Sequence, residues 1–144
     1  MENLFPAVPT EIPAQAAETV GRVPAFDSKT NRFLTRDGAL VERSGVEAVR
    51  QWIDLALHQQ IDRVPIYRTE GEVKIGINRQ LMGSKLPTGL AVAELERNVR
   101  ETLSFCPAIR AVRDLTVRRA GRTCKAAFTA VLHDGQSLEV NTDV

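Results

Sequence analysis

Two segments of the chain carry apolar residues at the spacing of an α-helix. The first runs from Ser44 to Gln59, and the second runs from Thr88 to Phe105, just before Pro107. A stripe of this period lets a helix bury one face against a core, and Glu47 at the third position after Ser44 predicts a capping box. We therefore expect two main helices. Their apolar stripes are Val46, Val49, Ile53, Ala56 and Leu57 in the first, and Val92, Leu95, Val99 and Leu103 in the second.

The pattern changes to alternation after Pro107. Every second residue is apolar in the run from Cys124 to Leu132, with its neighbours more polar on average, which is typical of a half-buried strand. Similar runs, 109–117 and 137–144, lie on either side, separated from it by turns at Gly121 and Gly135. We therefore predict an antiparallel sheet whose last strand leaves an edge open for pairing with another chain.

Shorter signals lie between these elements. Arg36-Asp37-Gly38 separates residues 32–35 from residues 39–42 within the segment Phe26 to Val41, and Asp-Gly is a strong signal for a tight hairpin turn. Pro65 argues against a central strand in residues 62–76, and a short helical turn is expected near residues 78–82. The predicted fold class is α+β, with two main helices packed on a small antiparallel sheet.

Residues 1–25 differ from the rest. They contain four of the seven prolines, and their apolar residues follow no helical or strand period. Apolar residues between prolines are typical of extended segments that dock on a partner, although a disordered tail has a similar composition. We predict an extended Pro-rich N-terminal arm over 1–25 and one α+β domain over 26–144. The partner-binding residues expected on the arm are Leu4, Phe5, Val8 and Ile12.

Composition narrows the possible partners. The 19 basic and 18 acidic residues give a net charge of +1, so neither nucleic acid nor an anionic membrane is an expected partner. No stretch approaches the roughly 18 apolar residues of a membrane span, and the first residues lack the pattern of a signal peptide. Cys106 and Cys124 show no metal-binding spacing, and we expect two buried thiols rather than a disulfide.

Several residues in these elements recur at spacings found in a known family. They are Arg63-x-x-Ile66-Tyr67-x-x-x-Gly71, then Leu81-Met82-Gly83, then Glu94-Leu95-Glu96-Arg97-x-x-x-Glu101-x-Leu103, and finally Pro107-x-Ile109-x-x-Val112 before a hairpin. In this order the chain resembles the baseplate sheath-initiator family of contractile phage tails. The resemblance covers residues 26–144 and is most specific over 94–112, whereas the arm lies outside it.

The resemblance implies a structural role without a cofactor. Proteins of this family sit in the virion tail baseplate, are assembled in the host cytoplasm, and are expected in six copies where tail tube, wedges and first sheath ring meet. The implied partners are the sheath protein, baseplate wedge proteins and tail tube or hub proteins. Arg63 and Tyr67 would contact a wedge protein, and Leu138 and Val140 would lie on the strand that templates the sheath by strand addition. The alternative is a small cytoplasmic α+β protein-binding module outside any tail.

The charged clusters leave their roles open. The run Glu94, Glu96, Arg97, Arg100 and Glu101 fits either a solvated helix face or a polar subunit interface. Arg63 with Tyr67 fits an interface anchor or an ordinary surface pair. The group Arg118, Arg119 and Arg122 fits a contact to an acidic partner or plain surface, since no aromatic stacking platform accompanies it.

No catalytic, cofactor-binding or metal-binding residue is predicted. The family is sometimes labelled lysozyme-like, but Glu70 and Glu72 have polar neighbours and no apolar pocket that would raise a carboxyl pKa for glycoside hydrolysis. His58 and His133 stand apart from other ligands, and neither a P-loop nor a dinucleotide fingerprint occurs. We therefore expect a protein that is not an enzyme.

Overall fold

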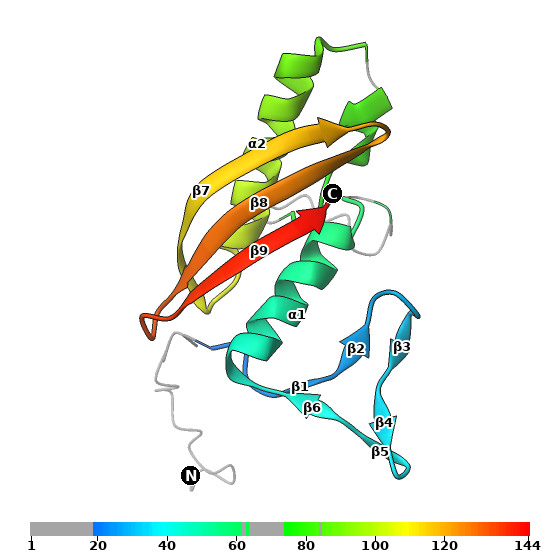
Figure 1. Ribbon diagram of the computed structural model, residues 1–144, viewed down its shortest axis with the longest axis vertical. Helices are drawn as coiled ribbons and strands as arrows, with labels where there is room; N and C mark the ends of the chain where they lie inside the picture. Colours follow the sequence, from blue (N-terminus) through cyan, green and yellow to red (C-terminus); the bar gives the residue numbers. More distant parts are fainter. Residues whose placement is uncertain (1–18, 62, 64–73, 84) are drawn as a thin grey trace, which may run out of the picture.

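The computed structural model describes residues 19–61, 63, 74–83 and 85–144. Within these residues, helices α1 (Gly45–His58) and α2 (Thr88–Ser104) lie on one side of a three-stranded antiparallel sheet (Figure 1). The strands of the sheet are β7 (Ile109–Ala120), β8 (Thr123–Leu132) and β9 (Ser137–Asp143). This arrangement confirms the predicted α+β class. Residues 1–18 of the predicted arm lie outside the described residues.

The core forms between the helices and the inner face of the sheet. Both predicted helix stripes are confirmed in their central positions, and the alternation in β8 is confirmed as well. Burying each large aliphatic side chain stabilises the fold by about 1.5–3 kcal/mol relative to exposure. The side chains that meet in this core include Val49, Ile53 and Leu57 from α1, Leu95, Val99 and Leu103 from α2, and Cys124, Ala126, Phe128, Ala130 and Leu132 from β8.

The start of α1 differs from the prediction. Ser44 occupies the N-cap position with an extended backbone, but its side chain makes no capping hydrogen bond, so the predicted capping box is wrong. Gly45 follows with a φ of +57°, a left-handed conformation that suits glycine. The chain therefore enters the helix through a left-handed residue, and the Ser44 side chain does not cap it.

The sheet has the strand order β7-β8-β9, so β8 is its central strand. A two-residue turn joins β7 to β8, and Gly121 supplies the positive φ of +64° that this tight connection requires. Val144 continues the pairing beyond β9, because its N–H donates to the Cys124 carbonyl at 2.8 Å. Among the described strands, β9 has a neighbour on one side only and is an edge strand.

Residues 23–43 form three short hairpins that meet at one point. The predicted hairpin is confirmed: β4 (Thr35–Arg36) pairs with β5 (Ala39–Leu40), and both residues of the turn have the positive φ of a type I′ turn. In addition, β2 (Phe26–Asp27) pairs with β3 (Arg32–Phe33), and β1 (Val23–Pro24) pairs with β6 (Glu42–Arg43). We call residues 23–43 the three-hairpin module.

A closed ring of backbone hydrogen bonds joins the three hairpins. Ala25 N–H donates to the Val41 carbonyl at 2.7 Å, Val41 N–H donates to the Leu34 carbonyl at 3.0 Å, and Leu34 N–H donates to the Ala25 carbonyl at 2.8 Å. The chain therefore changes its pairing partner at Ala25 between β1 and β2, at Leu34 between β3 and β4, and at Val41 between β5 and β6. The N–H and C=O groups of all three residues are therefore satisfied, as a partly buried junction requires.

One side chain of α1 fastens the module to the helix. The Gln51 amide oxygen accepts from Phe26 N–H at 2.9 Å and from the Arg43 guanidinium at 3.2 Å, while its amide nitrogen donates to the Pro24 carbonyl at 2.8 Å. Gln51 is buried, and Ala25 beside it is fully buried. The module is therefore held at a fixed position beside α1.

A second polar anchor holds residues 74–78 against α2. Gly76 has a φ of +129°, and a Cβ there would lie 2.8 Å from the Gln59 carbonyl oxygen, so only glycine fits. The Gly76 carbonyl accepts from Thr102 Oγ1 and from Asn98 Nδ2, each at 3.0 Å. The 3₁₀ helix Arg79–Gly83 follows and confirms the predicted short helical turn.

Candidate functional site

The free edge of β9 is a regular ladder of backbone groups. Val144 and Cys124 exchange both of their backbone hydrogen bonds, and the register continues without a shift to Val131 opposite Ser137. Hydrogen-bonded and non-hydrogen-bonded pairs alternate along an antiparallel ladder. The N–H and C=O groups of Glu139, Asn141 and Asp143 therefore point away from β8, where another strand can bind them.

The side chains of β9 divide between two faces. Leu138 is 3% exposed and belongs to the core, and Val140 and Thr142 on the same face are half-buried. The side chains of Glu139, Asn141 and Asp143 are exposed on the opposite, outer face of the sheet. The edge thus combines a packed inner face with a polar outer face.

A groove runs beside this edge. It has a volume of about 460 Å³ and lies between β9, α1 and the three-hairpin module. Val140 from β9, Ile53 from α1 and Leu34 from the module supply apolar lining, and Arg43, Arg50, Asp27 and Asp54 are among the charged groups of its wall. An added strand that paired with β9 would place its inward-facing side chains in this groove.

The opposite edge of the sheet, on β7, is irregular. Its pairing with β8 shifts between Ile109 and Ala111 and again between Arg113 and Thr116, so β7 contains an extra residue at each of two bulges. Asp114, within the second bulge, has a φ of +54°. Bulges of this kind interrupt a ladder and are a common protection of edge strands.

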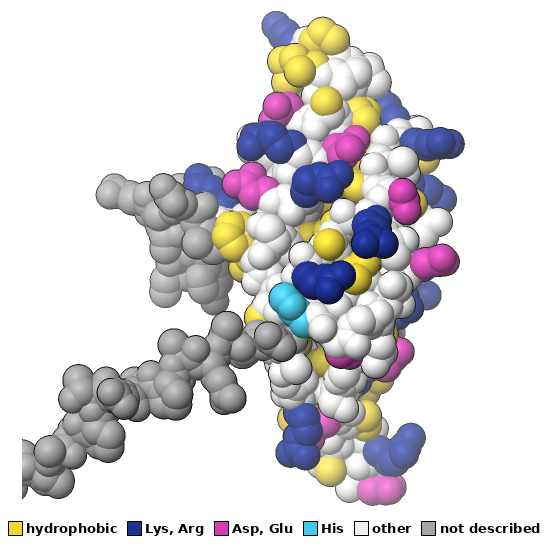
Figure 2. Space-filling model, turned by 90° about the vertical axis from the view of Figure 1, so that its left-hand side faces the viewer, with side chains coloured by type: hydrophobic (Ala, Val, Ile, Leu, Met, Phe, Trp, Pro, Cys, Tyr) yellow, Lys and Arg dark blue, Asp and Glu magenta, His cyan; other side chains and the backbone are white. Residues whose placement is uncertain are grey.

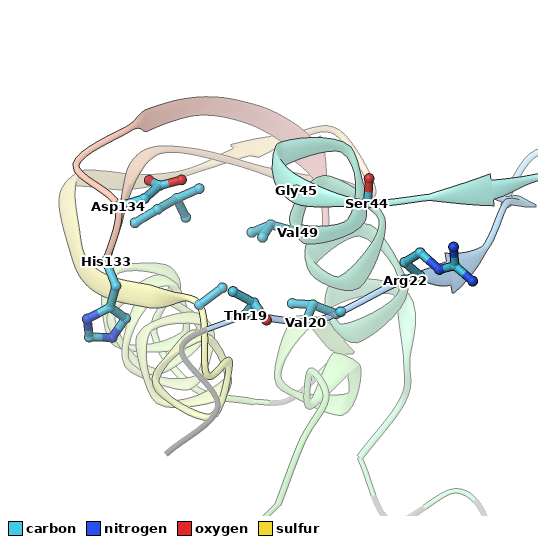
Figure 3. Close-up of a pocket in the computed structure, with 11 residues that line it drawn as sticks. Thr19, Val20, Arg22, Ser44, Gly45, Val49, His133 and Asp134 are labelled. Carbon is cyan, nitrogen blue, oxygen red and sulfur yellow. The ribbon is translucent and has the colours of Figure 1, made fainter. Parts of the chain in front are cut away.

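A second cavity lies at the start of α1 (Figure 3). It has a volume of about 380 Å³ and is lined by residues 19–22, the start of α1 and the β8–β9 turn. Val20 and Val49 point into it, whereas the Arg22 guanidinium and the His133 ring point away. Arg22 instead pairs with Glu42 at 3.2 Å. Val20 and Val49 therefore give the cavity an apolar interior.

The structure places the predicted site residues unequally. Val140 lines the groove. Leu138 is buried in the core, so its side chain cannot contact a partner and can only hold the backbone of β9 in place. Arg63 is exposed. The other predicted site residues, Tyr67, Leu4, Phe5, Val8 and Ile12, lie outside the described residues, as do Glu70 and Glu72.

Sequence reasoning missed the module side of the groove. Leu34 comes beside Arg43 and Arg50 only through the hairpin ring and Gln51. No periodicity or motif marks them, because their proximity depends on long-range hydrogen bonds. The only local signal was the Asp-Gly turn, which locates one hairpin and not the junction.

The helix α2 charge run forms exposed ion pairs. Arg97 lies 3.0 Å from Glu94 and 3.5 Å from Glu101, and all three side chains are substantially exposed. Such pairs contribute roughly 0.3–0.5 kcal/mol each to a helix. On the face seen in Figure 2, acidic side chains lie among the basic ones over the described residues, unlike the basic stripe of a nucleic-acid surface.

The two cysteines lie in surroundings that disfavour the thiolate form. Burial raises the pKa of the Cys106 thiol and of the Cys124 thiol, which is opposite to the shift that activates a nucleophilic cysteine. Within the described ranges, no group of three or more His, Cys, Asp or Glu residues is placed to hold a metal ion. No helix of the described chain is long and apolar enough to cross a membrane.

No protein-family model matches this sequence, and no curated protein matches it either.

Proposed function

We propose that this protein is a structural assembly subunit that receives an extended strand of a partner protein on the β9 edge. The observation that carries this proposal is the regular ladder of outward backbone groups at Glu139, Asn141 and Asp143 beside a groove of about 460 Å³. Main-chain hydrogen bonds would give the contact its affinity, and the groove would select the register.

Within this class, the proposed role is the sheath initiator of a contractile tail baseplate. The support is the resemblance of residues 26–144 to that family, whose members start the first sheath ring by strand addition. In this role the β9 edge receives the sheath protein, and Arg63 with Tyr67 contacts a wedge protein. Residues 23–25 of the predicted arm over 1–25 pair within the three-hairpin module. The residues before them dock along neighbouring tube, hub or wedge proteins through Leu4, Phe5, Val8 and Ile12.

Amide hydrogen exchange tests the sheath role directly. The full chain would be measured alone and together with the sheath protein encoded beside its gene. We expect the amides of Glu139, Asn141 and Asp143 to exchange at least tenfold more slowly in the assembly, since each becomes hydrogen-bonded. Unchanged exchange at these three amides in a formed assembly, or a gene neighbourhood without tail genes, would contradict the proposed role.

A separate substitution tests the wedge contact. Arg63→Ala removes an exposed guanidinium and is expected to reduce co-purification with the wedge protein while leaving sheath binding intact. Arg36→Ala is the control, since Arg36 is also an exposed arginine. Equal recovery of the wedge protein with both variants would remove Arg63 from the interface.

A further inference from the structure

We infer that the strand received by β9 carries basic residues at two positions four apart, with apolar residues at the inward-facing positions between them. This inference rests on the proposed function and specifies the chemistry of the partner. The basic residues would lie opposite Glu139 and Asp143 on the outer face of the sheet, and the apolar residues would enter the groove.

The basic positions of the partner strand are inferred from acidic side chains on the outer face of β9. Glu139 and Asp143 are exposed, lie on the same face, and make no ion pair with any described residue. Thr129 is the β8 neighbour of Glu139, and Lys125 is the β8 neighbour of Asp143. Toward the open edge, both carboxylates lack a neighbour among the described strands. Opposite charges directly across a ladder stabilise pairing, so basic residues are favoured there.

The apolar half comes from the groove. An incoming residue between the two basic ones projects to the inner side of the sheet, because side chains alternate along a strand. Opposite Val140 it meets the side of the groove that Leu34 and Ile53 also line. The expected pattern is basic, apolar, any, apolar, basic. It reads the same in both directions, so it holds for a parallel or an antiparallel partner.

Two segments of this chain are disfavoured as the occupant. Residues 1–18 contain three glutamates and no lysine or arginine, so they offer no basic side chain to Glu139 and Asp143. The β7 strand of a second copy does carry Arg113 and Arg118 on its outer face, but the bulge between Arg113 and Thr116 breaks the regular ladder. The charge pattern therefore favours a strand of another protein as the occupant.

Peptide titration of the full chain tests the inference. The probes are three nine-residue peptides: acetyl-Ser-Thr-Lys-Val-Thr-Val-Lys-Thr-Ser-amide and its versions with both lysines replaced by glutamine or by glutamate. Binding is followed by NMR at the β9 amides in 150 mM salt. We expect the lysine peptide to bind roughly fivefold more tightly than the glutamine peptide, from two cross-strand charge pairs, and the glutamate peptide to bind most weakly.

Charge reversal on the protein provides the matched control. The variant E139K/D143K should reverse the ranking of the lysine and glutamate peptides, because both substituted side chains are exposed and the backbone ladder is unchanged. The variant R113E/R118E reverses charges two strands away and should keep the original ranking, since these charges are largely screened beyond about 8 Å. Circular dichroism verifies that both variants fold.

The outcomes separate the inference from the proposed function. If all three peptides shift the Glu139, Asn141 and Asp143 amides with equal affinity, strand addition stands, but the inferred preference for basic residues opposite Glu139 and Asp143 is overturned. If the E139K/D143K variant still binds the lysine peptide more tightly than the glutamate peptide, this preference is also overturned. If no peptide perturbs these amides at millimolar concentration, the β9 edge is not a receiving edge, and both the inference and the proposed function fail.

Discussion

The two outer strands of the sheet present opposite kinds of edge. Strand β9 pairs with β8 over seven successive residues without a shift, whereas β7 is interrupted by two bulges. Both strands contribute buried side chains to the same core, so their difference lies in the backbone and not in hydrophobicity. Within one small sheet, then, one edge is protected against pairing and the other is left regular.

The neighbouring elements also leave the β9 edge more open than the β7 edge. Helix α2 packs along β7, while β9 faces a groove between α1 and the three-hairpin module. Regular edges invite pairing with other chains, and proteins usually block them. A regular edge beside a shaped groove is therefore the feature of this molecule that is best explained by a specific partner.

The largest expected effect comes from proline placed on each edge. Asn141→Pro removes an outward N–H from β9 and should weaken strand docking by about 3 kcal/mol, roughly a hundredfold, because the ring blocks the ladder. The matched variant is Arg119→Pro on β7, whose N–H also points outward, because Cys124 opposite it bonds to Val144. Isothermal titration with a partner strand should detect docking in Arg119→Pro only. Equal loss in both variants would mean that the two edges are equivalent.

The next effect concerns the module side of the groove. Gln51→Ala leaves Phe26 N–H and the Pro24 carbonyl without their partner, and should lower the free energy of unfolding by about 2 kcal/mol. Urea denaturation measures this change. Arg50→Ala, at the neighbouring exposed position on α1, should change stability by less than about 0.5 kcal/mol. Similar stability of both variants would show that Gln51 does not fasten the module.

A valine substitution on each outer strand compares the bulged backbone of β7 with the regular backbone of β9. Asp114→Val places a β-branched residue at a φ of +54° and should destabilise the fold by about 1–2 kcal/mol. Asn141→Val lies in a regular exposed strand, where valine is favoured, and should be neutral or stabilising by up to about 0.5 kcal/mol. The midpoint temperature of thermal unfolding should therefore fall for Asp114→Val and stay unchanged or rise for Asn141→Val. A harmless Asp114→Val would indicate that the bulge is not rigid.

The smallest effect is a pH dependence in the module. Hydrogen bonds from the Thr30 side chain and the Lys29 backbone hold the pKa of Asp27 below its ordinary value of 3.8. A lowered folded-state pKa means that the carboxylate stabilises the turn above pH 3.8 and that this contribution is lost as pH falls through the folded-state value. The Lys29 amide NMR signal should therefore move on acidification below pH 3.8, and the movement should be reduced in Asp27→Asn. Signals of β7 amides should stay unaffected by this titration.

The sequence predicted the elements well where a period or a turn motif was strong. The stripe of α2 and the alternation of β8 identified both elements and their buried faces, because helix and strand geometry impose those periods on the core side. The polar residues Asn98 and Thr102 were not expected on the buried side of α2. Their role depends on Gly76, which is 22 and 26 residues away along the chain.

The candidate site was predicted only in part. The last strand and an open edge were expected from the alternation, but the groove and the module were not. The segment 32–35 read as one continuous strand, yet Leu34 is the point where its pairing partner changes. A partner change leaves no local signal, because the same extended backbone serves either partner.

By itself, the sequence determined the two main helices, the strands of the three-stranded sheet and which of their faces are buried, since hydrophobic spacing reflects local backbone geometry. The tertiary structure alone decided the ring at Ala25, Leu34 and Val41 and the position of Gln51 beside it. It also decided that β7 is bulged while β9 is regular. These features depend on hydrogen bonds between distant residues and on where an extra residue is accommodated, and neither is encoded in a local pattern.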